Sequence, residues 1–175
     1  MKIRPITKKD VPQIIKLIGD IWAEYDCVLD TQGDDKYLLA PDDYFHSKDG
    51  EFWVAAERNE IIATVGVLML DEKTAELKSL YVRGDFRREN LGENLIKLAV
   101  KSASMKVRSE IILWSDTRFT NAHRLYEKLG FKLLGKRELK DTNKSIELGF
   151  KRNTYICESV VEIERTKSTI YEANF

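Results

Sequence analysis

Three consecutive runs of strand-forming residues, followed at once by a helical pattern, limit the fold of this chain more than any other feature. The runs lie within residues 51–82, and the segments Arg58-Asn59-Glu60 and Asp71-Glu72-Lys73-Thr74 separate them as turns. Turns this short join antiparallel neighbours in one sheet. The next segment has a helical period that is expected to continue to about Ser104, with apolar residues at Leu91, Leu95, Leu98 and Ala99.

The third of these runs contains a break in its alternation. Its apolar residues are Leu77, Leu80 and Val82, so a gap of three positions precedes a gap of two. A regular strand alternates with a period of two, so the change of parity predicts a β-bulge near Lys78-Ser79. Such a bulge re-aims side chains and is common beside active sites.

The rest of the chain extends this pattern into an α/β (α+β) arrangement of one mixed, mostly antiparallel sheet of about six or seven strands, with helices on both faces. Thr7 and Asp10 form a capping signature at the start of the first helix. The helix over 120–131 is expected to be capped by Thr120 or Asn121 and to end at Gly130. The remaining predicted elements are a strand at 2–6, a short helix at 41–46, a strand at 109–116 that is buried on both faces, and final strands at 131–140 and 155–165.

Composition narrows the classes of function. The chain has 175 residues, 29 basic and 29 acidic, and a formal net charge of zero. This length suits a single domain, and the charge balance argues against nucleic-acid binding through bulk charge. The sequence contains no apolar run of the length that a membrane-spanning helix requires, and its start reads as mature sequence. We therefore expect no nucleic-acid partner, no membrane span and a cytoplasmic protein.

The cysteines and histidines offer no metal site. Cys27 and Cys157 lie far apart, and we expect reduced thiols, with a disulfide or a catalytic cysteine as weaker alternatives. His46 and His123 lack metal-ligand spacing and are expected to be structural.

The start of the helix after the third run has the chemistry of an anion site. The first amides of a helix lack intrahelical partners and carry partial positive charge. Arg87 and Arg88 add side-chain charge immediately before this helix. On this segment alone, an ordinary surface helix is the favoured interpretation.

Two motifs together resemble the GNAT superfamily of acetyl-CoA-dependent N-acetyltransferases. The segment Arg87-Arg88-Glu89-Asn90-Leu91-Gly92 is similar to the family's acyl-CoA signature, Gln/Arg-x-x-Gly-x-Gly/Ala after a strand that ends in valine. Asn121 and the residues LYEKLGF at 125–131 are similar to its second signature. The resemblance covers about residues 3–135 and implies the GNAT fold, one N-acetyltransferase domain over 1–175, and C-terminal strands and a tail over 136–175.

The resemblance also implies roles toward coenzyme A. Arg87 would lie at the entrance of the loop, and the backbone of Leu80, Tyr81 and Val82 would pair with the pantetheine arm as an added strand. The amide of Leu80 would hold the acetyl carbonyl, and Asn121 would contact the pantetheine amides. The pyrophosphate would bind backbone amides of Arg88, Asn90, Leu91, Gly92 and Glu93.

Asn90 departs from the family pattern, which has glycine at this position. Asparagine tolerates left-handed backbone angles better than other residues with a Cβ. We therefore expect the loop to keep its shape, with close approach of the phosphates as the open question.

Acetyl transfer to an amine requires a neutral amine, a stabilised oxyanion and a protonated or stabilised leaving thiolate. By the resemblance, Tyr126 would be the general acid. Glu76, four residues before Leu80, would be the general base, directly or through water, unless it is a surface carboxylate paired with Lys73 or Lys78.

The resemblance also implies that the segment after the first helix lines the acceptor site for a small-molecule or peptide amine, with Glu24, Tyr25 and Asp26 as substrate-binding residues. Ordinary solvation of a polar loop is the alternative for this acidic segment. Two other functions stay open: transfer from a longer acyl-CoA donor, and a regulatory acyl-CoA-binding module without turnover. A homodimer through an exposed C-terminal strand is the oligomer that the sequence allows.

Overall fold

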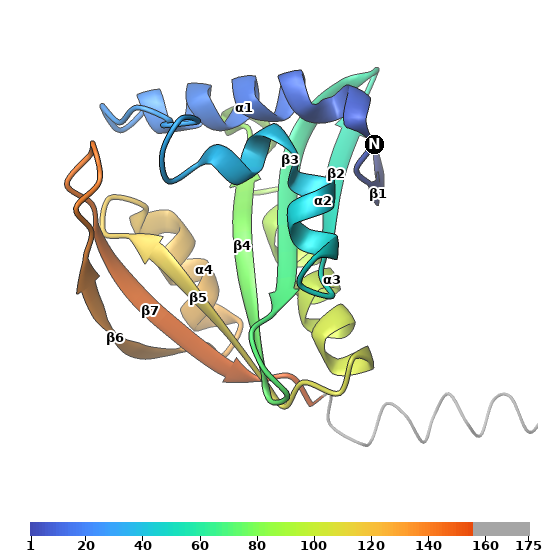
Figure 1. The fold of residues 1–175 in the computed structure, drawn as a ribbon, viewed down its shortest axis with the longest axis vertical. Coiled ribbons are helices and arrows are strands. Elements are labelled where there is room, and N and C mark those ends of the chain that lie inside the picture. Colours follow the sequence, from blue (N-terminus) through green and yellow to red (C-terminus); the bar gives the residue numbers. More distant parts are fainter. Residues whose placement is uncertain (156–175) are drawn as a thin grey trace, which may run out of the picture.

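Seven strands form one mixed sheet in the computed structural model, which describes residues 1–155 (Figure 1). The order across the sheet is β1-β2-β3-β4-β5-β7-β6. Among the strands of the described residues, only β4 and β5 pair in parallel, which confirms the expected mixed and mostly antiparallel sheet. The strands are β1 (Lys2–Pro5), β2 (Glu51–Glu57), β3 (Glu60–Met69), β4 (Thr74–Val82), β5 (Glu110–Asp116), β6 (Lys132–Glu138) and β7 (Ile146–Asn153).

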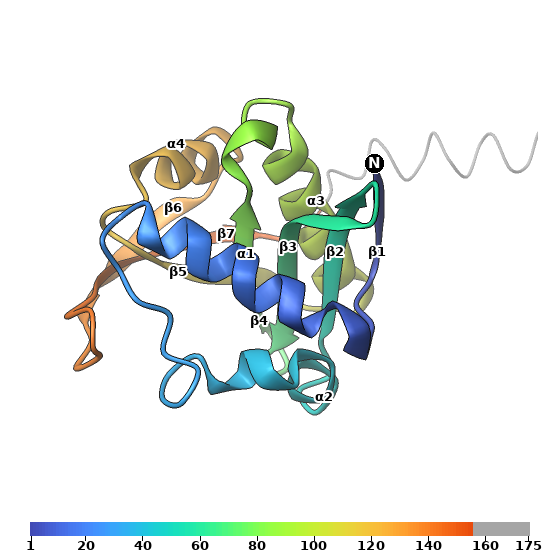
Figure 2. The same ribbon diagram turned by 90° about the horizontal axis from the view of Figure 1, so that it is seen from above.

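Helices cover both faces of the sheet, as the sequence predicts (Figures 1 and 2). On one side lie α1 and α2, and on the other α3 and α4. The helices are α1 (Val11–Ala23), α2 (Pro41–His46), α3 (Leu91–Met105) and α4 (Thr120–Lys128), with short 3-10 turns η1 (Lys8–Asp10), η2 (Lys36–Leu39) and η3 (Gly84–Phe86).

The predicted capping signature organises the start of α1. The Thr7 amide donates to Asp10 Oδ2 at 2.7 Å, and Arg4 binds the same carboxylate through two nitrogens at 2.7 and 2.8 Å. The Arg4 guanidinium and these hydrogen bonds lower the pKa of Asp10 to about 2. This contact ties the first strand to the first helix.

Each face of the sheet has its own apolar core. Ile14, Leu17, Ile18 and Ile21 of α1 pack with Phe45 on one face. On the other face, α3 and α4 pack on the central strands with the buried side chains of Leu91, Leu95, Ile96, Ala99, Val100, Ala103 and Tyr126. The helical period read from the sequence therefore matches the faces that are buried.

Three expectations need correction. β5 is buried on alternate residues: Ile111 and Leu113 are buried, whereas Trp114 is partly exposed because its ring lines a cavity and lies under Arg137, 4.2 Å from the guanidinium carbon. The cap of α4 is Phe119, one residue before the expected range. The seventh strand is Ile146–Asn153, where the sequence pattern predicts none.

Some expectations concern residues outside the described part of the chain. Of the predicted strand at 155–165, only Tyr155 is described, and it is not in a strand. The remainder of that strand, its proposed role in a dimer and Cys157 lie outside the described residues. Within residues 1–155, Cys27 is buried and has a free thiol.

Candidate functional site

A bulge in β4 lies at the place where the alternation breaks. Thr64 faces Tyr81 and Gly66 faces Lys78, so Ser79 and Leu80 stand opposite the single residue Val65. Ser79 has a left-handed backbone with φ of 56°. The Thr64 hydroxyl donates to the Ser79 carbonyl at 2.8 Å and holds the bulge in place. The predicted bulge is confirmed, and it sets the direction of Leu80.

The two parallel strands separate immediately before this bulge. β4 and β5 pair only over Thr74–Glu76 and Glu110–Ile112. From Leu77 onward, the edge of β4 that faces β5 has no strand partner among the described residues, and the two strands diverge (Figure 1). A cavity of about 980 Å³ lies in this opening and is lined by residues of both strands.

The loop before α3 has a tight, left-handed geometry although Asn90 stands where the family motif has glycine. Asn90 is left-handed, with φ of 60° and ψ of 7°, and Arg88 has φ of 71°. The first intrahelical bond runs from the Asn94 amide to the Asn90 carbonyl at 2.9 Å. The amides of residues 88–93 therefore have no acceptor among the described residues.

Close packing behind this loop explains the one glycine that the motif keeps. A Cβ on Gly92 would lie 3.2 Å from Leu125 Cδ2 and 3.7 Å from Val82 Cγ2. These neighbours come from α4 and β4, so α3 begins where the three elements meet. Arg88 and Gly92 both line the cavity.

Arg87 forms contacts that the sequence did not reveal. Its Nη1 and Nη2 bind Glu24 Oε2 and Oε1 at 2.7 and 3.0 Å, and its Nε donates to the Val82 carbonyl at 3.0 Å. The expected loop-entrance residue and an expected substrate-binding residue are thus paired with each other. The pair ties the end of α1 to the loop before α3.

Glu93, at the third position of α3, is also held by cations. Its carboxylate pairs with Lys97 and Lys128, each at 2.8 Å. These two lysines lower the pKa of Glu93 to about 2. The carboxylate next to the free amides is therefore ionised and neutralised by its own partners.

Tyr126 lines the cavity from α4 and is only 4% exposed. Burial raises the pKa of its phenol above the ordinary value, and the neighbouring Ser115 hydroxyl offsets part of this rise. Ser115 in turn lies 3.2 Å from Nε2 of the buried His123. Asn121, an exposed residue of the same helix, also lines the cavity.

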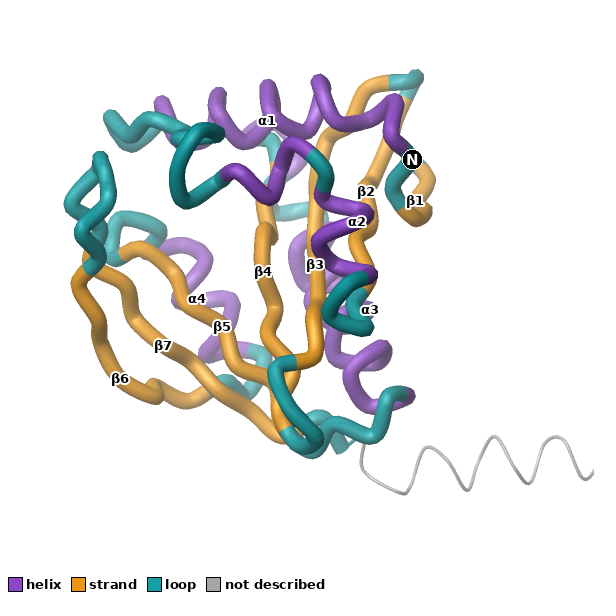
Figure 3. Tube along the Cα trace, in the orientation of Figure 1, coloured by secondary structure: helices purple, strands orange, loops and turns teal. Residues whose placement is uncertain are grey.

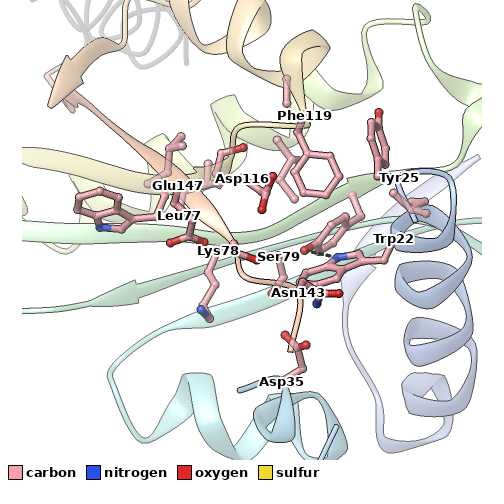
Figure 4. Close-up of a pocket in the computed structure, with 18 of the residues that line it drawn as sticks. Trp22, Tyr25, Asp35, Leu77, Lys78, Ser79, Asp116, Phe119, Asn143 and Glu147 are labelled. Carbon is pink, nitrogen blue, oxygen red and sulfur yellow. Dashed lines mark hydrogen bonds between the residues drawn. The ribbon is translucent and has the colours of Figure 1, made fainter. Parts of the chain in front are cut away.

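Glu76 lines the cavity from β4 and is partly exposed. Neither Lys73 nor Lys78 forms an ion pair with the Glu76 carboxylate. Lys78 Nζ lies instead over the Tyr37 ring, 4.9 Å from its centre. Near this region, burial raises the pKa of Asp35. Figure 4 shows side chains of the cavity, with Asp35 and Lys78 among those labelled.

The structure separates the three expected substrate-binding residues. Tyr25 lines the cavity and packs edge-on against Phe119, with ring centres 4.8 Å apart. Glu24 is bound to Arg87, and neither Glu24 nor Asp26 lines the cavity. Asp26 has a left-handed backbone with φ of 56° and follows the end of α1.

Several lining residues carry no short-range sequence signal. Trp22 Nε1 donates to the Tyr81 hydroxyl at 2.9 Å, across 59 positions of sequence. Ser115, Phe119 and Asn143 also line the cavity. Only the fold brings these side chains together.

The described residues offer neither a metal-binding cluster nor a membrane-spanning helix. Among residues 1–155, no group of three or more histidine, cysteine, aspartate and glutamate side chains is placed to hold a metal ion. In the same part of the chain, no helix has the length and apolar character to cross a membrane.

Known proteins resemble the chain in sequence and in fold. The family model described as Acetyltransferase (GNAT) family matches residues 15–131. Human N-acetyltransferase 8 is 31% identical over 120 residues, which are 65% of this chain and 51% of that protein, so the chain spans about half the length of this curated relative.

Two solved structures share the fold. An acetyltransferase of the GNAT family from Staphylococcus aureus Mu50 superposes with a TM-score of 0.78 at 20% identity, covering 88% of this chain and 99% of that one. An aminoglycoside 6'-N-acetyltransferase complexed with coenzyme A gives a TM-score of 0.67 at 16% identity, covering 90% and 99%. At these identities the likeness shows the fold.

Proposed function

Because the chain belongs to the acetyltransferase (GNAT) family, whose members are acetyl-CoA-dependent enzymes, we propose that it transfers an acetyl group from acetyl-CoA to a primary amine by direct attack. One observation carries the proposal. A helix start with unpartnered amides, an open strand edge, Glu76 and Tyr126 all line one cavity. Each is a part that acetyl transfer requires.

The loop before α3 fits the pyrophosphate of coenzyme A. Unpartnered amides at a helix start attract anions through hydrogen bonds and the helix dipole. Asn90 supplies the left-handed turn, and Gly92 leaves no side chain between α3 and its neighbours. The amides of Arg88, Asn90, Leu91, Gly92 and Glu93 would hold the phosphates.

The open edge of β4 fits the pantetheine arm. Main-chain groups of an unpaired strand edge bind an extended ligand as a further strand. Arg87 already occupies the Val82 carbonyl, so Leu80 and Tyr81 would contribute most of this pairing. The bulge aims the Leu80 backbone, and its amide would stabilise the oxyanion; Asn121 would hold the amides of the arm.

Tyr126 would act as the general acid. Its raised pKa keeps the phenol protonated at neutral pH, so it is a proton donor and not a base there. Acetyl-CoA supplies the activated thioester carbonyl when bound. The phenol would deliver its proton to the departing sulfur, and the neighbouring Ser115 hydroxyl would support it in the buried setting.

Glu76 would act as the general base. An attacking amine must lose its proton, since an ammonium with a pKa of about 10.4 has no lone pair. The Glu76 carboxylate has no cation partner among the described residues and lines the same cavity as Tyr126. Tyr25 would form part of the acceptor wall, and Glu24 would act by holding Arg87.

A thiol-release assay tests this function. The protein is incubated with acetyl-CoA and separately with polyamines, amino acids, aminoglycosides and short peptides. Thiol release that depends on one of these amines, and that Tyr126→Phe abolishes, supports the proposal. Tight coenzyme A binding with no amine-dependent release would make the chain a binding module.

A further inference from the structure

Two loops meet across one side of the cavity. One follows α1 and contains Val28 and Asp30, and the other joins β6 to β7 at residues 139–145. Figure 3 draws both as loops that lie side by side, and Figure 2 shows the β6–β7 loop and the loop before α3 on opposite sides of α1. The meeting point is therefore away from the proposed pyrophosphate end.

Asn143 joins these loops with a two-sided contact. The Val28 amide donates to Asn143 Oδ1 at 2.8 Å, and Asn143 Nδ2 donates to the Val28 carbonyl at 2.8 Å. The side-chain amide thus behaves as a peptide group of a neighbouring strand, across 115 positions of sequence. Thr142 Oγ1 adds a longer contact of 3.5 Å to Asp30 Oδ2.

Both sides of the contact are held by their own hydrogen bonds. Arg118 donates to the Asn143 carbonyl at 2.9 Å and to Asp116 Oδ2 at 2.9 Å. Asp141 accepts from the amide and hydroxyl of Ser145 at 2.7 and 2.6 Å. On the other loop, the Asp30 amide donates to Asp35 at 3.0 Å.

We propose that Asn143 is a specificity-determining residue, which closes this side of the cavity and restricts the acceptor to short amines. The inference rests on the proposed amine acetylation. Thr142 and Asn143 line the cavity together with Asp30, and Trp22 and Tyr25 line the same cavity.

Chain dimensions explain why a polypeptide is excluded here. An extended chain needs a spacing of about 4.8 Å to a neighbour on each side, so two loops that flank it must stand about 10 Å apart. Asn143 and Val28 are in direct hydrogen-bond contact at 2.8 Å. On this side, an amine must therefore end within the cavity, or the clasp between Asn143 and Val28 must open.

Turnover of a graded series of amines tests the inference. Glycinamide, diglycinamide and tetraglycinamide share one amine and differ in length. Asn143→Ala removes both contacts, Asn143→Asp keeps an acceptor for the Val28 amide, and Asn94→Ala makes the same change on the exposed side of α3.

We expect kcat/KM for tetraglycinamide relative to glycinamide to rise at least tenfold in Asn143→Ala, less in Asn143→Asp and not at all in Asn94→Ala. A ratio within twofold of the wild type in Asn143→Ala overturns the inference.

Hydrogen exchange and fluorescence separate this inference from the proposed function. The Val28 amide should exchange at least tenfold faster in Asn143→Ala, and unchanged exchange overturns the clasp whatever the activity. If the wild type acetylates none of the three amines, acrylamide quenching of tryptophan decides, because Trp22 and Trp114 line the cavity. Stronger quenching in Asn143→Ala supports restricted access, and equal quenching overturns it.

Discussion

Replacing Asn90 measures how much the loop before α3 depends on its left-handed turn. Asn90 has φ of 60°, is exposed and makes no side-chain capping bond to α3. Asn90→Ala therefore removes no side-chain cap of α3. Its main effect is to raise the free-energy cost of the left-handed backbone conformation at residue 90. Asn90→Gly removes that cost and restores the residue that the family motif has.

The expected size follows from backbone energetics. A left-handed residue with a Cβ costs about 1–2 kcal/mol, and asparagine avoids part of this cost. Asn90→Ala should lose about 1 kcal/mol in the free energy of unfolding, or about 2–4 °C in Tm for a chain of this size. Asn90→Gly should be nearly neutral, since relief of strain and the greater freedom of the unfolded chain offset each other.

Urea unfolding followed by tryptophan fluorescence measures the stability, and calorimetric titration measures the Kd of coenzyme A. The loop of Asn90→Ala can also relieve the strain by leaving its left-handed conformation. That part of the cost should then appear as a weaker Kd for coenzyme A, with about 1.4 kcal/mol corresponding to a tenfold change. Asn94→Ala, in the helical part of α3, is the matched control and should change neither quantity appreciably. If Asn90→Ala is as stable as Asn90→Gly and binds coenzyme A as tightly, the loop does not need the left-handed turn.

Three further changes test other parts of the account. Tyr126→Phe should lower kcat at least about 100-fold, the scale of general acid catalysis, with Kd for acetyl-CoA within twofold; an unchanged kcat in steady-state assays would refute the assignment. Glu76→Gln should remove the acidic limb of the pH–rate profile, and an identical limb in both proteins would show that Glu76 is not the base. Asp10→Asn tests the Arg4 contact: the folded pKa of about 2 lies below the ordinary aspartate pKa of 3.8, so Asp10 stabilises the fold above pH 3.8 and loses this effect as pH falls toward 2. Acid unfolding curves should show about 2 kcal/mol less pH-dependent stability in the variant over this range, and superimposable curves would contradict the reasoning.

The sequence predicts the elements near the site because their signals are local. The parity break at Leu77 and Leu80 revealed the bulge, since side-chain alternation records strand register directly. Asn90 was expected to be left-handed because few other residues adopt that angle readily, and the structure has it so. Gly130, expected to end α4, has φ of 81°.

The contacts that complete the site could not be predicted, because they join segments that are distant in the sequence. Glu24 and Arg87 are 63 positions apart, and nothing in either segment indicates the pair. The prediction that β5 is buried on both faces was wrong for a similar reason. An apolar run does not reveal that β4 and β5 diverge and leave Trp114 beside a cavity. β7 was not predicted because its residues, IELGFKRN, combine glycine and charged residues with few apolar positions.

The fate of a labelled acetyl group tests the central claim most directly. The protein is incubated with acetyl-CoA that carries an isotope in its acetyl carbons and with a mixture of amines, and the amines are examined by mass spectrometry. The account predicts labelled amide on one class of amine, formed in equal amount to the released thiol and lost in Tyr126→Phe. Label that stays on coenzyme A or appears only as acetate, while coenzyme A binds the protein, would contradict it.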